Sequence, residues 1–138
     1  MKTKPSDKIY LGESNIPDAG RGVFAADTID KDEVVEVCPV LVLPTKDYAL
    51  AKQTILRDYY FMWGKKTSAI CLGYGSFYNH SYEPNTTYKK NLADKTIEFV
   101  ALKKIKKNEE ITVNYNYGDP DDKSELWIED IEPYKDEK

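Results

Sequence analysis

The sequence predicts a mainly β (α+β) fold of several small, short-stranded sheets, with one inserted helix and one short C-terminal helix. Runs rich in β-branched and aromatic residues recur along the chain between polar turns, which is typical of short strands. Only one stretch before the C-terminal end changes to a helical period. A length of 138 residues suits one domain with its own hydrophobic core.

The first half of the chain predicts strands followed by a helix. Strand-like runs occupy 8–15 and 32–43, with the turn PDAGRG and the short run VFAA between them. The next stretch has apolar residues at steps of three and four, namely Tyr48, Ala51, Ile55, Tyr59 and Met62. This spacing predicts a helix over about 45–63.

The second half returns to strands, which we expect at 68–75, 96–105 and 110–118. The segment GSFYNHSYEPNTTY at 75–88 has neither a strand nor a helix pattern. A last helix is expected between Pro120 and Pro133. No linker interrupts the chain, so 1–138 is interpreted as one domain, with a core over about 8–118 and a C-terminal cap over 119–138.

The composition excludes several classes of protein. A formal net charge of −4 argues against nucleic-acid binding through bulk charge, whereas the acidic stretch 118–138 suits a partner rich in lysine or arginine. No apolar run approaches the ~20 residues that cross a bilayer, and no secretory signal is visible at the start. Cys38 and Cys71 are expected to be buried free thiols in a cytoplasmic protein, with one internal disulfide as the less favoured alternative. Two cysteines and one histidine do not supply a zinc site, so no metal is expected.

Two features of the chain suggest ligand binding without identifying the ligand. Gly20 and Gly22 precede a strand rather than a helix, which excludes a dinucleotide or phosphate loop but leaves room for close approach of backbone amides to a small ligand. His80, the only histidine, lacks partners for catalysis or metal binding and by itself favours a structural role. The eleven tyrosines form either packing contacts or a cage of rings for a cation.

Taken together, GRGVFA, YNHSYEPN and EEITVNYNYG resemble, in order and spacing, the SET-domain protein-lysine methyltransferases. The resemblance covers about 8–118 and is strongest to small stand-alone SET proteins of bacteria and large viruses. It implies a SET-domain fold with a C-terminal pseudoknot, and transfer of a methyl group from S-adenosylmethionine to a lysine amine, leaving S-adenosylhomocysteine. The implied partner is a lysine-containing basic protein such as a histone, with no direct nucleic acid and no membrane. The expected location is the cytoplasm of a bacterium, or the host cell or nucleus for a virus, and a homodimer is left open.

The resemblance also implies roles for particular residues. The loop Gly20, Arg21 and Gly22 would cradle the cofactor's amino-acid end, and Asn79 and His80 would bind the cofactor from the chain crossing.

The catalytic residues implied by the resemblance are aromatic. Tyr115 would be the central tyrosine, touching both cofactor and amine, while Tyr88 and Tyr117 would line the lysine channel. Tyr59 would be a further pocket aromatic, with plain core packing as the alternative. Trp127 would cover the adenine or wall the channel, with a simple helix anchor as the alternative.

Two departures from the family pattern bear on the site. No cysteine triplet follows Tyr117, so the acidic segment around Trp127 would have to replace the zinc-binding cap of many relatives. Val113 stands where an aromatic residue often tunes the number of methyl groups added, so the product is left undecided.

The implied reaction needs a neutral amine but no strong base. A sulfonium ~4 Å from the lysine ammonium would repel it by roughly 4 kcal/mol, which lowers the lysine pKa by about three units. Tyr115 is therefore expected to orient the amine, with proton abstraction secondary. Two other interpretations stay open: a non-catalytic SET-like module that binds a lysine-bearing peptide or the cofactor, and a β-rich interaction domain.

Overall fold

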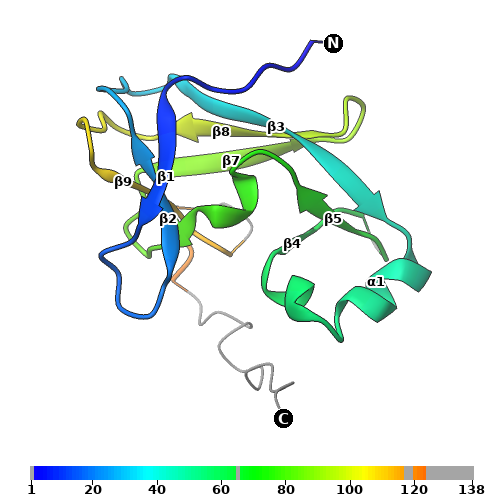
Figure 1. Cartoon of the computed structure of the whole chain (residues 1–138). Coiled ribbons are helices and arrows are strands. Elements are labelled where there is room, and N and C mark those ends of the chain that lie inside the picture. Colours follow the sequence, from blue (N-terminus) through cyan, green and yellow to red (C-terminus); the bar gives the residue numbers. More distant parts are fainter. Residues whose placement is uncertain (1, 65, 117–119, 124–138) are drawn as a thin grey trace.

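The protein forms two sheets, as seen in a computed structural model that describes residues 2–64, 66–116 and 120–123 (Figure 1). The smaller sheet has the order β1-β2-β9-β6, with bounds Ile9–Glu13, Arg21–Ala25, Glu110–Val113 and Asn79–His80. The larger sheet has the order β4-β5-β3-β8-β7, with bounds Tyr60–Met62, Ser68–Cys71, Val34–Leu43, Thr96–Ala101 and Thr86–Asn91. The predicted mainly β fold of small sheets is confirmed.

Strand β3 is the longest strand and organises the larger sheet. Its first half pairs antiparallel with β8 and its second half pairs antiparallel with β5. Cys38 and Val40 alternate with the exposed Pro39 and Leu41, as the pattern of a half-buried strand requires. An irregularity in the β3–β8 register lies between Val34 and Glu36, so the two consecutive residues Val35 and Glu36 are both buried.

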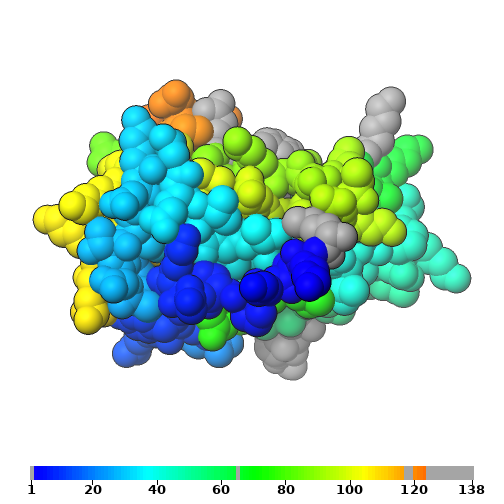
Figure 2. Space-filling model, turned by 90° about the horizontal axis from the view of Figure 1, so that it is seen from above, coloured from blue at the N-terminus to red at the C-terminus, as the bar shows by residue number. Residues whose placement is uncertain are grey.

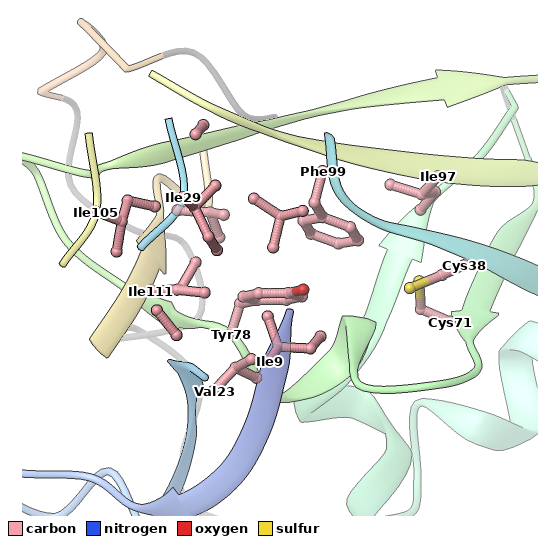
Figure 3. Packing of buried hydrophobic residues seen from close by; sticks show 14 of the residues in the cluster. Ile9, Val23, Ile29, Cys38, Cys71, Tyr78, Ile97, Phe99, Ile105 and Ile111 are labelled. Atoms are coloured by element: carbon pink, nitrogen blue, oxygen red, sulfur yellow. The ribbon is translucent and has the colours of Figure 1, made fainter. Parts of the chain in front are cut away.

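The hydrophobic core lies between the two sheets and takes side chains from both (Figure 3). Phe99 of β8 stacks on Tyr78, with their ring centroids 4.3 Å apart. Ile97 and Ile111 are completely buried, one from each sheet. Cys38 and Cys71 are buried and free, as the sequence predicted. Their sulfur atoms lie close together at one end of the cluster (Figure 3).

The helix predicted over 45–63 is wrong in its extent. The α-helix α1 covers only Thr45–Ala51, the 3₁₀ turn η1 follows at Ile55–Asp58, and Tyr60–Met62 form the edge strand β4. Phe61 packs against the core in β4, with its ring edge-on to Tyr88 at 5.2 Å. This tertiary contact favours a strand, whereas Ile55 in the predicted apolar stripe is 56% exposed.

Two strands, β6 and β7, are not predicted by the sequence patterns. The residues of β7 are mostly polar, and β6 consists of only Asn79 and His80. Strand β6 pairs parallel with β9, which brings His80 opposite Val113. This pairing joins the two segments that the predicted chain crossing brings together.

The N-terminal residues before β1 lie along the surface beside β3 (Figure 2). The Ser6 hydroxyl donates to the Val35 carbonyl at 2.7 Å, and Lys8 forms an ion pair with Glu33 at 2.7 Å. The predicted C-terminal helix and most of the predicted cap at 119–138 lie outside the described residues. Within the residues that are described, no helix combines the length and apolarity that a membrane crossing needs.

Candidate active site

Two adjoining hollows meet at the junction of the two sheets. One is a narrow channel of about 80 Å³ and the other is an open cleft of about 660 Å³. Four residues line both hollows: Asp58, Tyr59, Ser76 and Tyr115. A ligand in the cleft and a second ligand in the channel would therefore meet at this wall.

The cleft is lined by the loop before β2 and by the segment before β6. Gly20 adopts φ +76°, a conformation that L side chains rarely adopt, and no atom lies near enough to touch an added Cβ there. Arg21 places its guanidinium 4.8 Å from the centroid of the Phe77 ring. Glu13 and Asp18 also line the cleft, so its wall carries both signs of charge.

Asn79 ties the cleft wall together from β6. Its side-chain amide donates to the Arg21 carbonyl at 3.1 Å and to the Glu110 carboxylate at 2.8 Å. These two hydrogen bonds use the side-chain NH₂ of Asn79. Its side-chain oxygen is therefore oriented to accept a hydrogen bond from a ligand.

Gly22 leaves the space that this arrangement needs. A Cβ at Gly22 would overlap a carboxylate oxygen of Glu110 and would lie 2.9 Å from the Asn79 amide nitrogen. Glu110 also accepts from the Ser14 hydroxyl at 2.8 Å, so one carboxylate links β9 to β6 and to the residue that follows β1. The position therefore requires glycine for close approach, whereas Gly20 requires it for its backbone angle.

Tyr115 stands at the wall shared by both hollows. Its hydroxyl donates to the Tyr78 carbonyl at 2.8 Å. Burial, followed by the influence of Tyr59 and Glu110, raises the pKa of Tyr115 to about 12. The phenol is therefore protonated near neutral pH and donates this hydrogen bond.

His80 lines neither hollow. Its Nδ1 accepts a hydrogen bond from the Tyr115 backbone N–H at 3.1 Å, so the neutral imidazole carries its proton on Nε2. The ring also packs edge-on against Tyr82, with centroids 4.4 Å apart. His80 thus holds the backbone of Tyr115 in place.

Aromatic side chains from β4 and β7 form much of the channel. Tyr88 lies between Phe61 and Phe99, with ring centroids 5.2 Å and 5.7 Å away. Lys90 lines the channel as well, and its ammonium donates to the Met62 carbonyl at 2.9 Å.

The structure brings most of the predicted site residues into one region. The cleft contains Gly20, Arg21 and Asn79, the channel contains Tyr88, and both contain Tyr59 and Tyr115. Gly22 and His80 support this wall without lining it. The remaining two predicted residues, Tyr117 and Trp127, lie outside the described residues.

Sequence reasoning missed several residues of the site. Asp58 and Ser76 line both hollows, and Phe77 carries the Arg21 contact. Ser76 and Phe77 belong to the segment GSFYNH. Their closeness in sequence to Asn79, a predicted cofactor-binding residue, could have indicated that they line the site. No sequence signal marked Asp58 as a site residue, because it lies within the stretch whose spacing predicted a helix.

In the described part of the chain, no group of three or more histidine, cysteine or acidic side chains is placed to hold a metal ion.

Comparison with known proteins points to one family. The SET-domain family profile matches residues 20–116. A protein of fission yeast, Schizosaccharomyces pombe, named histone-lysine N-methyltransferase, H3 lysine-37 specific, is 37% identical over 112 residues, which cover 80% of this chain and 71% of that protein.

Solved structures agree with this match. The crystal structure of a protein from Plasmodium falciparum, described as a candidate histone methyltransferase, is 31% identical and has a TM-score of 0.60. The match covers 83% of this chain and 96% of that one. Polycomb Repressive Complex 2 of Chaetomium thermophilum, solved with S-adenosylmethionine, shares the fold at 22% identity with a TM-score of 0.70, covering 85% of this chain and 16% of that chain. These relatives are eukaryotic, whereas the motifs suggested small bacterial or viral proteins.

Proposed function

The chain belongs to the SET-domain family, and from this membership we propose how its two hollows carry out the family's reaction. It is an S-adenosylmethionine-dependent protein-lysine N-methyltransferase, and its substrate is a protein that carries a lysine. We propose that the cleft takes the cofactor and the channel takes the lysine side chain. The observation that carries this assignment is the wall that both hollows share at Tyr59 and Tyr115.

The residues of the cleft fit the cofactor. A volume of about 660 Å³ is within the range of pockets that hold ligands of this size. The cofactor's amino-acid end carries an ammonium and a carboxylate, which match the Asn79 oxygen and the Arg21 guanidinium. Gly20 and Gly22 allow the backbone to approach this end closely.

The channel suits an unbranched amine chain. When bound, S-adenosylmethionine would supply a sulfonium methyl group. A neutral amine would attack its carbon in line with the C–S bond, and S-adenosylhomocysteine would leave. The chain's contribution is positioning, because the aromatic walls at Tyr88 and Phe61 restrict the amine to one line of approach. Tyr115, protonated because its pKa is about 12, fixes the shared wall through its hydrogen bond to the Tyr78 carbonyl.

We propose a basic protein, of the histone H3 type, as the substrate. The fission-yeast relative is named for a lysine of histone H3. The sequence of 118–138 carries nine acidic residues against three lysines, which would attract a basic tail. We propose that Tyr117 and Trp127 complete the site from this segment, and that the protein works where histones are made or assembled, in cytoplasm or nucleus.

The test is methyl transfer to recombinant histone H3. The protein is incubated with isotopically labelled S-adenosylmethionine and histone H3, and mass spectrometry locates the label. Label on an H3 lysine supports the substrate proposal. Label only on other proteins of a whole-cell lysate rejects the histone substrate, and cofactor binding in a calorimeter without any transfer would favour a non-catalytic module.

A further inference from the structure

We propose that Glu36, a buried residue of β3 that lines neither the channel nor the cleft, is a positioning residue for methyl transfer. Its carboxylate holds both ends of the 3₁₀ turn η2 (Gly75–Phe77), which carries part of the active-site wall. The inference deepens the proposed function, because it assigns a role in the same reaction to a residue outside the site.

The two carboxylate oxygens of Glu36 are used at opposite ends of the turn. One oxygen accepts a hydrogen bond from the Tyr78 hydroxyl at 2.8 Å. The other accepts a hydrogen bond from the Tyr74 backbone N–H at 3.0 Å. Tyr74 precedes η2 and Tyr78 follows it, so a single side chain bridges the turn from outside. Within the turn, the Phe77 N–H donates to the Tyr74 carbonyl at 2.9 Å.

The local structure of β3 directs Glu36 inward. The register irregularity between Val34 and Glu36 places Glu36 on the buried side beside Val35, and only 6% of Glu36 is exposed. Gly73 clears the path of the carboxylate, since a Cβ there would lie 2.5 Å from a Glu36 oxygen. A buried carboxylate is retained in a core only where donors satisfy it, and here two donors do so.

The held turn leads directly to the reacting region. The Tyr78 carbonyl accepts a hydrogen bond from the Tyr115 hydroxyl at 2.8 Å. The Tyr78 ring packs in the core against Phe99 (Figure 3). Ser76 in the middle of η2 lines both hollows and donates to the Tyr59 carbonyl at 3.2 Å. Release of the turn would therefore displace Tyr115 and Tyr59 together, at the wall where amine and methyl group meet.

The main variant is Glu36→Met, which keeps an unbranched side chain of similar length and removes both acceptors. We expect kcat to fall about 10- to 100-fold, the size of effect that small misplacements of a reacting group produce, with a much smaller change in the Kd of S-adenosylmethionine. Glu36→Gln is the conservative variant, because its oxygen can accept from Tyr74 and its amide can donate to the Tyr78 phenol oxygen. We expect Glu36→Gln to restore most of the activity.

The matched control is Ile105→Val, a fully buried substitution at the isolated bridge with Ile29, away from η2. It lowers stability without touching the turn. Hydrogen–deuterium exchange of residues 72–80 should rise in Glu36→Met and stay unchanged in Ile105→Val. If Glu36→Met does not fold, Tyr78→Phe, which removes only the hydroxyl donor, should show a smaller fall in kcat with the same rise in exchange.

Each outcome decides the inference. Wild-type kcat in Glu36→Met, unchanged exchange at 72–80, or a loss no larger than that of Ile105→Val overturns the positioning role. Wild-type protein that transfers no methyl group contradicts the proposed function instead, and the exchange measurement then still decides whether Glu36 holds the turn.

Discussion

Tyr115 and Gly22 each occupy a position that is fixed by specific neighbours. Tyr115 is held at three points: its backbone N–H by His80, its hydroxyl by the Tyr78 carbonyl, and its ring near the His80 ring at 5.3 Å. At position 22 only glycine fits, because any Cβ there would clash with Glu110 and Asn79. Both residues are therefore sensitive to changes of only a few atoms.

Removal of the Tyr115 hydroxyl should affect chemistry more than binding. In Tyr115→Phe the hydrogen bond to the Tyr78 carbonyl is lost, and we expect kcat to fall about a hundredfold. The Kd of S-adenosylmethionine, measured by calorimetry, should change far less. Tyr10→Phe is the control, because it removes an exposed hydroxyl that donates to Asn108 away from the site. Full activity in Tyr115→Phe would remove the central role assigned to this residue.

The two glycines of the cleft loop should respond differently to alanine. Gly22→Ala displaces Glu110 and Asn79, so we expect cofactor affinity to fall about tenfold or more. Gly20→Ala strains the backbone at φ +76° by about 1–2 kcal/mol, which should lower stability while leaving the cleft in shape. Calorimetric titration and thermal unfolding of both variants measure the two effects. An equal loss of affinity in both would reject the steric account of Gly22.

At the scale of elements, the site depends on strands joined across long stretches of sequence. Strand β6 contributes only two residues to its parallel pairing with β9. Side chains strengthen this weak junction: Asn85 is buried, donates to the Glu110 carbonyl at 2.9 Å and accepts the Thr112 N–H at 2.9 Å. Asn85 thus binds the edge of β9 where a longer strand would otherwise pair.

Loss of the Asn85 side chain should weaken this junction. Asn85→Ala leaves the partly buried N–H of Thr112 and carbonyl of Glu110 without these partners, and we expect about 1–3 kcal/mol of destabilisation in urea unfolding. Asn91→Ala removes a comparable pair of hydrogen bonds to Asp94 at an exposed turn. It should cost less than about 1 kcal/mol. Equal costs for the two variants would contradict the role of Asn85.

For the whole molecule, the core contains groups that must stay uncharged. Burial raises the pKa of Tyr78 well above its usual value of 10, and the hydrogen bond with Cys71, followed by burial, raises the pKa of Cys38 above its usual value of 9.0. Tyr115 adds a third such group at the edge of the core. Deprotonation of these groups therefore lowers the stability of the folded state.

Stability should therefore fall at alkaline pH. A pKa raised on folding gives stability that is complete below the unfolded pKa and is lost as pH rises through the folded pKa. For Tyr115 this window runs from about pH 10 to above pH 12, and the full loss is about 3 kcal/mol. Urea unfolding between pH 8 and pH 12 measures the loss, and Tyr115→Phe should reduce the slope. An unchanged slope in that variant would contradict the raised pKa.

The sequence by itself determined the mainly β fold, the two cysteines in the core and the motifs that identify the family, because alternation and turn chemistry are local properties of the chain. Only the tertiary structure decided that Tyr60–Met62 form a strand, because the contact between Phe61 and Tyr88 overrides the helical spacing. The link from Glu36 through Tyr78 to Tyr115 was equally invisible, because hydrogen bonds between residues about forty positions apart leave no pattern in the sequence.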